Sequence, residues 1–296
     1  MSDSSESLRR KIATAADLQS VVRTMKAIAA SSIGQYEGAV RALEDYDRTV
    51  KLSLRACLGP AQVKRLSAPS VSNRANGVGA IGVIVFGSDQ GLVGKFNESM
   101  LDFLVNTLAS LPGKKIIWAV GERIQSRLND TALLQGKHFA LPSAIGAITP
   151  LVGQILVEVE RLREKGEMSQ VYVFHHRPQA GAIYNPVVQR LLPLDQAWRQ
   201  AICEIPWPSP LLPEVLNASD QTLQAFVREY LFVSLFRACA ESLASENASR
   251  LAAMQRAEKN ITDLLEELNR AFHRQRQSGI DEELFDLVAG FEALKH

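Results

Sequence analysis

The N-terminal part of the chain carries apolar residues at a helical spacing. They recur every three or four residues, at Leu8, Ile12, Ala15, Leu18, Val22, Met25, Ala29, Ile33, Tyr36, Val40, Leu43, Tyr46, Val50 and Leu54. The mean step of about 3.5 residues is that of a coiled-coil seam. The pattern predicts one helix over 8–57, about 75 Å long at about 1.5 Å per residue, which Gly59 and Pro60 end.

The last third of the chain repeats this spacing. It contains no proline from Asp220 to Leu294, and its apolar positions include Leu223, Val227, Leu231, Leu235, Ala238, Leu251, Met254, Ala257, Ile261, Leu264, Leu268 and Phe272. Ser219 and Asp220 are suitable N-caps. We expect one interruption, at Gly279, beyond which the stripe continues at Ile280, Leu284, Leu287, Val288 and Phe291. Neither terminal helix can bury its narrow seam alone, which predicts an antiparallel pair.

Between these helices the pattern changes to short apolar runs, which are typical of buried strands. The expected strands are 80–86, 115–120 and 170–174, and the expected helices cover roughly 97–110, 121–128 and 147–165. Strands that alternate with helices predict a small α/β sheet.

The fold class is therefore α/β, with an antiparallel coiled coil of the long N- and C-terminal helices and a central Rossmann-like α/β domain. We place the N-terminal helix at 1–58, the α/β domain at 59–213 and the C-terminal helix at 214–296. A Ser-, Asn- and Gly-rich stretch at 67–79 is the predicted linker into the α/β domain.

Composition narrows the classes of function. The 33 Lys and Arg balance 32 Asp and Glu, for a net charge of +1, so no global basic field would recruit nucleic acid or an anionic membrane. The three cysteines are far apart and odd in number, which favours a reducing compartment over a disulfide framework or a zinc site. No secretory leader is recognisable, and no apolar run approaches the roughly 20 residues of a membrane span. We expect no direct membrane insertion.

One glycine-rich segment is a candidate phosphate-binding site. Gly87-Ser-Asp-Gln-Gly-Leu-Val-Gly-Lys95 follows the first strand and opens a helix, where phosphates bind in many folds. As a Walker A loop it fails, because Asp89 stands at the first glycine position and Phe96 at the magnesium-binding hydroxyl. The glycines also lack the dinucleotide-binding spacing. We predict a structural turn formed by Ser88, Asp89, Gly91 and Gly94, and the alternative is an anion site.

Other candidate groups predict no catalytic, cofactor or metal site. His175 and His176 are adjacent on a predicted strand and would point to opposite faces. A Ser–His–Asp triad lacks the G-x-S-x-G turn that would present its serine. The acidic residues of the C-terminal helix are interpreted as a solvated face, namely Glu241, Glu246, Glu266 and Glu267.

The N-terminal helix begins with a basic segment. This segment contains one acid, Asp17, and five basic residues, namely Arg9, Arg10, Lys11, Arg23 and Lys26. Aromatic residues, which a nucleic-acid arm would interleave, are missing from this segment. A surface for acidic protein partners fits better, and the alternative is an ordinary solvated helix face.

Four segments in order resemble the gamma subunits of F-type rotary ATP synthases. Met25-Lys-Ala-Ile-Ala-Ala-Ser31 resembles the family's Met-Lys-x-Val-Ala-Ala-Ser, and Ser88-Asp-Gln-Gly-Leu-Val-Gly-Lys-Phe-Asn97 resembles its Ser-Asp-Arg-Gly-Leu-Cys-Gly-Gly-x-Asn loop. Leu191-Leu-Pro-Leu194 follows, and the C-terminal run matches in order and spacing at Glu241, Ser242, Ala244, Ser245, Glu246, Arg250, Ala253, Met254, Asn260, Leu268, Asn269, Arg276, Gln277, Ile280, Glu283, Leu284 and Gly290. The resemblance covers nearly the whole chain.

The resemblance implies a rotor shaft without bond chemistry of its own. Its expected partners are three alpha and three beta subunits, the epsilon subunit and the membrane c-ring, at the cytoplasmic face of a bacterial inner membrane. Ion flow through that ring would be coupled to ATP synthesis or hydrolysis. The implied rotor–stator contacts are Arg23, Met25, Lys26, Arg276 and Gln277.

The chain also departs from the family pattern. Gln90, Val93 and Lys95 replace Arg, Cys and Gly in the glycine segment, and two glycines lie within 32–38, which suggests a divergent branch. Two other functions remain open: a stand-alone α/β enzyme with a ligand site near Gly87–Lys95, and a coiled-coil adaptor.

Overall fold

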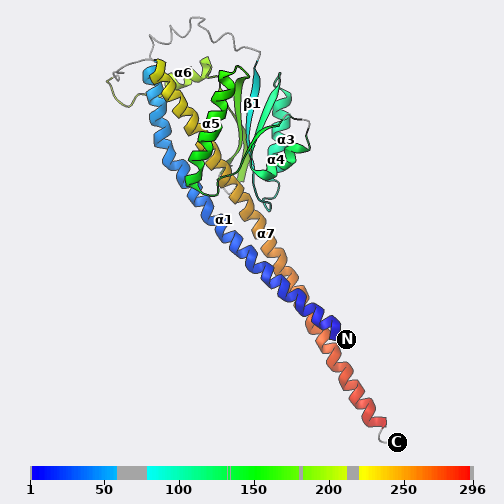
Figure 1. Ribbon diagram of the computed structural model, residues 1–296. Coiled ribbons are helices and arrows are strands. Elements are labelled where there is room, and N and C mark those ends of the chain that lie inside the picture. The colour runs from blue at the N-terminus through cyan, green and yellow to red at the C-terminus, as the bar shows by residue number, and fades with distance from the viewer. Residues whose placement is uncertain are drawn as a thin grey trace. The chain divides into compact units, whose positions relative to one another are not determined.

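The computed structural model describes residues 2–58, 79–131, 133, 135–179, 183–211 and 220–293. Its elements are, in order, α1 (Ser2–Cys57), β1 (Ala80–Phe86), α3 (Phe96–Ala109), β2 (Lys115–Val120), α4 (Glu122–Asn129), β3 (Gln135–Phe139), η2 (Ile145–Ala147), α5 (Ile148–Glu164), β4 (Met168–Gln179), β5 (Ile183–Leu192), α6 (Gln196–Glu204) and α7 (Asp220–Ala293) (Figure 1). Gly59, Pro60, Ser219 and the predicted linker up to residue 78 lie outside the described residues.

The chain divides into two compact units, and α1 and α7 contribute to both. The helical unit comprises 1–30 and 250–296, and the sheet unit comprises 31–249. Among the described residues, no helix has a stretch long and apolar enough to span a membrane.

The sheet unit is built on five strands in the order β3-β2-β1-β4-β5. The pairs β1–β2, β1–β4 and β2–β3 are parallel, and β4–β5 is antiparallel. The predicted strands at 80–86 and 115–120 are confirmed. The third is longer than predicted, and β3, β5 and α6 were not predicted.

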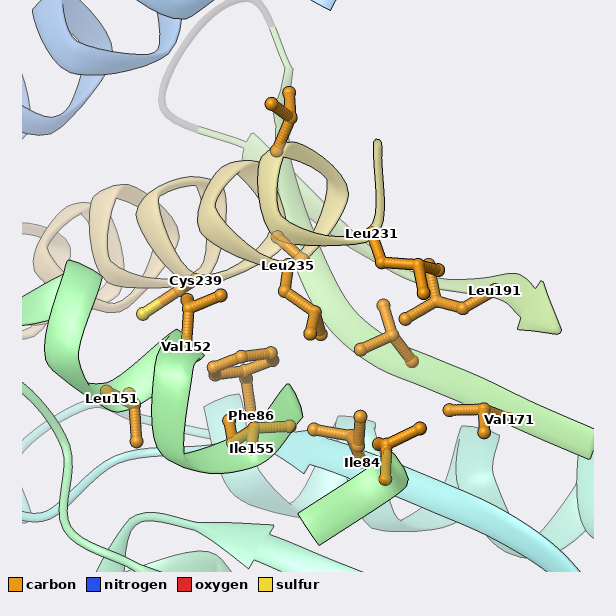
Figure 2. Close-up of a cluster of buried hydrophobic side chains, with 14 of the residues drawn as sticks. Ile84, Phe86, Leu151, Val152, Ile155, Val171, Leu191, Leu231, Leu235 and Cys239 are labelled. Carbon is orange, nitrogen blue, oxygen red and sulfur yellow. The ribbon is translucent and has the colours of Figure 1, made fainter. Parts of the chain in front are cut away.

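The central strand β1 joins the two hydrophobic cores of the sheet unit, since its residues alternate between the two faces. On one face, Ile81, Val83 and Val85 pack with Met100 and Leu104 of α3 and with α4. On the other face, Ile84 and Phe86 point toward Ile155 of α5 and toward α7 (Figure 2). All seven residues of β1 are buried, which explains its continuous apolar run.

In the helical unit α1 and α7 are antiparallel. The Gln19 side-chain amide donates a hydrogen bond to Thr262 at 2.9 Å, and Arg9 lies over the ring of Phe272, so residue numbers rise along one helix as they fall along the other. Ala15 is buried at this seam. The predicted antiparallel pairing is present.

Three details of the predicted helices are wrong. Leu18, expected in the seam, is 53 % exposed, because the neighbouring Gln19 faces α7 instead. In the sheet unit Tyr46 is also exposed, and its hydroxyl donates to Glu229 at the edge of the helix pair. Gly279 does not interrupt α7, which is one helix to Ala293.

Candidate functional site: the glycine turn, the buried acid of α7 and the helical surface

The glycine turn after β1 is held by its own side chains. The buried Ser88 donates its backbone N–H to Asn97 Oδ1 at 3.1 Å, and the Asn97 amide donates back to Ser88 Oγ at 2.8 Å. Asp89 accepts a hydrogen bond at 2.9 Å from the backbone N–H of Glu122, in the first turn of α4. Gly87 has no room for a side chain, because a Cβ there would lie 2.2 Å from Ile124.

The second half of this turn points outward. Leu92 has φ 63°, which is uncommon for a side chain of this size, and it is 60 % exposed. Gly94 has φ 56°, and Lys95 is exposed. The backbone groups that a phosphate would need at Ser88 and Glu122 are already hydrogen-bonded to protein side chains. These hydrogen bonds agree with a structural turn at Ser88, Asp89, Gly91 and Gly94, which stays a prediction.

The turn is tied to α7 and to the sheet within the sheet unit. Ser249 of α7 donates a hydrogen bond to the Val93 carbonyl, and its hydroxyl is 2.8 Å from the Tyr184 hydroxyl. Phe96 stacks on His176 with ring centroids 4.2 Å apart. The position of the turn therefore depends on α7.

A buried acid on α7 forms the strongest electrostatic feature of the sheet unit. Glu241 Oε2 lies 2.8 Å from His175 Nε2 and 3.1 Å from Arg177 Nε, and Glu241 Oε1 accepts from Arg237 Nε at 2.8 Å. We call these four residues the Glu241 cluster. Burial alone would raise the pKa of Glu241, but the hydrogen bonds from His175 and Arg237 outweigh it and lower that pKa to about 2.

Burial lowers the pKa of both histidines of the pair. His175 lies in the Glu241 cluster, and desolvation lowers its pKa more than Glu241 raises it. The pKa of His176 falls to about 3 by the same cause, and its Nε2 is 3.2 Å from the Ser99 hydroxyl. The two side chains contact different elements, as the strand pattern predicted. The part of the chain that the structure describes contains no group of three or more metal-binding side chains.

The prediction of a solvated acidic face on α7 is wrong for two of its four residues. Glu241 and Glu246 are each 4 % exposed, whereas Glu266 and Glu267 are exposed. The reason is that α7 is buried without a break over 238–249, where Ala240, Ala244 and Ala248 allow neighbouring elements to approach closely. In the sequence, these spaced alanines were the available indication of burial.

The helical unit carries the predicted rotor–stator residues. Arg23 Nε lies 2.9 Å from Glu258 Oε1, and Lys26 Nζ lies 2.5 Å from Glu258 Oε2. Met25 is half-buried. One acid therefore holds two cations, and the basic surface keeps a net positive charge at this point. Arg276 and Gln277 are exposed on α7. They come later in the sequence than Glu258 and its two contacts.

The far part of α7 exposes large apolar side chains. Ile280, Leu284, Phe285, Leu287 and Val288 are 51–73 % exposed; we call them the apolar tip. Gln19 opposite Thr262 and Arg9 opposite Phe272 set a register in which α1 begins near the level of Gly279. The apolar tip thus continues past the start of α1. The sequence showed this stripe, but not that its large side chains would be exposed in the part of the chain that the structure describes.

Comparison with known proteins identifies the family of the chain. A family model described as ATP synthase matches residues 4–294. The ATP synthase gamma chain of an Arthrobacter species is 28 % identical over 97 % of this chain and 96 % of its own length. That of Brevibacillus brevis is 26 % identical over 97 % of both chains.

Solved structures agree in fold. A chain of the Euglena gracilis mitochondrial ATP synthase rotor superimposes with a TM-score of 0.64, at 15 % identity, over 95 % of this chain and all of that chain. A chain of the Tetrahymena thermophila central stalk and c-ring gives a TM-score of 0.54 at 18 % identity, covering 80 % and 99 %. The α/β sheet with paired terminal helices is thus the fold of a rotary central stalk, and the chain belongs to the ATP synthase family. Within that family it is of the gamma type, the central rotor stalk.

Proposed function

We propose that this gamma-type chain turns as the shaft of an F-type ATP synthase and performs no bond chemistry itself. Its partners are three alpha and three beta subunits around the shaft, with the epsilon subunit and the membrane c-ring joined to it. The complex couples ion flow to ATP synthesis or hydrolysis, and the chain lies peripherally at the cytoplasmic face of a bacterial inner membrane. Family membership and the names of the full-length relatives support this assembly.

The apolar tip is the observation that carries the proposal. Burying one large apolar side chain fully is worth about 1.5–3 kcal/mol, and contiguous exposed apolar surface marks an interaction site. In the proposed assembly the alpha and beta subunits surround the apolar tip and bury it. Apolar contacts with such a sleeve can be exchanged at each step without breaking an ion pair. The acids between these side chains, Asp281, Glu282, Glu283 and Asp286, are also exposed.

The titratable groups support a role without catalysis. A general acid or base works best with a pKa near the operating pH. Glu241 has a pKa of about 2, and the pKa of His175 lies below its usual range. The Glu241 cluster therefore holds its protons fixed near neutral pH and fits a structural task.

Co-expression tests the proposal directly. The chain should elute with alpha, beta and epsilon subunits on size exclusion, and the complex should hydrolyse ATP while the isolated chain does not. Leu284→Asp with Phe285→Asp should lower recovery or turnover of the complex several-fold. Val157→Asp is the matched control, since Val157 is 67 % exposed on α5 of the sheet unit. A stable isolated chain with its own enzymatic activity would instead favour the stand-alone enzyme.

We propose that Arg276 and Gln277 contact loops of the beta subunits. Both are exposed, and together they offer donors and acceptors. A hydrogen bond is worth about 0.5–1.5 kcal/mol, and up to about 3 kcal/mol when charged, so one loop can be bound and released at each step. Changing both to Ala should leave the shaft folded and reduce assembly or hydrolysis several-fold.

The equally exposed Gln255 and Arg256 are the control for this pair. Equal yield and turnover for the two double variants would exclude a special contact at Arg276 and Gln277. The same comparison applies to Arg23, Met25 and Lys26, which we propose as a second contact beside Glu258.

A further inference from the structure

A cavity of about 350 Å³ opens beside the Glu241 cluster, entirely within the sheet unit. Its charged lining comes from three elements: Glu37 and Arg41 of α1, Arg177 of β4, and Arg237 and Glu241 of α7. We propose that this cavity, the arginine pocket, binds a phosphate-bearing anion, either inorganic phosphate or the phosphate chain of a nucleotide. None of its lining residues belongs to the apolar tip or to the proposed rotor–stator contacts.

The arginines have donors to spare. Arg177 and Arg237 each contact Glu241 through Nε alone, and a guanidinium carries five N–H donors. Their terminal Nη groups therefore remain for a ligand. The Arg41 side chain has no hydrogen bond or ion pair in the described part of the chain, and it is exposed. Three guanidinium groups with unused donors line one small cavity.

The charge balance of the lining favours an anion. Glu241 is already neutralised by its contacts in the Glu241 cluster. Glu37 is exposed and can turn to solvent. The nearby Asp47 of α1 is tied to Lys51 at 2.5 Å, and Glu44 also acts on Arg237 through its charge. The arginines therefore exceed the carboxylates of the lining by one charge.

Shape and chemistry together select phosphate. Arginine binds phosphate through two parallel N–H···O bonds, and the cavity volume lies at the lower end of the roughly 300–1,000 Å³ of small-molecule sites. Val40, Pro178 and Ala244 complete the lining, so it offers no aromatic ring on which a base could stack. The recognised part of a nucleotide would thus be its phosphate chain.

Arginine footprinting of the assembled complex tests this proposal. The complex is treated with phenylglyoxal, and modification of each arginine of this chain is followed by peptide mass spectrometry, which is blind to the catalytic sites of other subunits. The arms are inorganic phosphate, ADP, adenosine and chloride at equal ionic strength. Recovery of the complex is checked first, so that failure of assembly is distinguished from failure of the pocket.

We expect phosphate and ADP to protect Arg41 and Arg177, and adenosine and chloride to protect neither. At about ten times the Kd the modification rate should fall roughly tenfold. Arg48, exposed on the same helix as Arg41, is the internal control and should react equally in all arms. Protection by inorganic phosphate alone would identify the free ion as the ligand, and protection by ADP alone would identify the nucleotide.

Arg41→Gln provides the decisive variant, since Arg41 is exposed and its replacement should leave the fold intact. In this variant phosphate should no longer protect Arg177. The proposal is overturned if Arg177 stays protected in the variant, if Arg48 is protected as strongly as Arg41, or if phosphate and ADP change no rate. It is also overturned if Arg41 and Arg177 never react in the complex, because a partner would then cover the pocket.

Discussion

Replacing Glu241 with Gln tests whether the Glu241 cluster holds α7 to the sheet. The amide keeps the shape and can still accept hydrogen bonds, so the loss is chiefly that of charge. The pKa of Glu241 is about 2 against an ordinary value of 4.5, a difference worth about 3 kcal/mol. Arg177 is 50 % exposed and Arg237 is 39 % exposed, and solvent screening of these partners reduces the expected loss to about 2–3 kcal/mol.

Urea unfolding of the full chain measures this loss. Trp118 is 1 % exposed in the sheet unit and reports its unfolding by fluorescence. The Glu241→Gln chain should lose about 2–3 kcal/mol of unfolding free energy at pH 7, visible as a lower urea midpoint at unchanged slope. Glu266→Gln is the control on the same helix: its ion pair with Arg270 is exposed, so it should change stability by less than about 1 kcal/mol.

The pH dependence separates charge from packing. The folded pKa of Glu241 is depressed, so its stabilisation is complete above about 4.5 and is lost as the pH falls through about 2. The difference between Glu241→Gln and wild type should therefore be equal at pH 7 and pH 5 and fall to roughly half or less at pH 3. A difference that is absent at pH 7, or unchanged at pH 3, would refute the reasoning.

Three further changes test other parts of the molecule. Lys95→Ala, at an exposed position of the glycine turn, should leave ATP turnover of the complex within a few-fold, and a 100-fold loss, about 2.7 kcal/mol, would contradict the structural reading of that turn. Leu268→Asp should reduce recovery of intact complex on size exclusion, because it buries an unpaired charge at a half-buried position of α7; normal recovery and melting would place Leu268 outside the seam. His176 has a pKa of about 3, so its contribution to stability is lost as the pH falls from 6.5 toward 3. His176→Phe should make the urea midpoint less sensitive to pH over that window, and an unchanged slope would refute this assignment.

The spacing of apolar residues predicted the elements that are packed in the same way along their whole length. The strands at 80–86 and 115–120 are apolar throughout because both faces of the parallel sheet are covered. Helices α3, α4 and α5 begin and end within a few residues of their predicted bounds. In contrast, β3 is Gln-Gly-Lys-His-Phe and lies at the edge of the sheet. An edge strand of polar residues carries no apolar pattern, and only its pairing with β2 makes it a strand.

The candidate site was less predictable, because its contacts join residues far apart in the chain. Glu241 and His175 are 66 residues apart, and no local spacing shows that a carboxylate on a helix will meet a histidine on a strand. The wrong prediction that Leu18, and not Gln19, faces α7 has a similar origin. Both positions fit a spacing of three or four residues, and the partner Thr262 decides which of them faces α7.

The two units hold the same two helices by different means, and that difference bears on function. In the sheet unit α7 is buried over 238–249, and its polar groups find protein partners, as when Ser245 donates to the His176 carbonyl. In the helical unit the seam rests on small residues such as Ala15 and Ala29 and on polar bridges such as that of Glu258. A helix pair with so little buried apolar surface gains little stability from its own contacts. Its exposed apolar tip needs a surrounding protein, so a shaft that turns within a ring of subunits is the role that satisfies both observations.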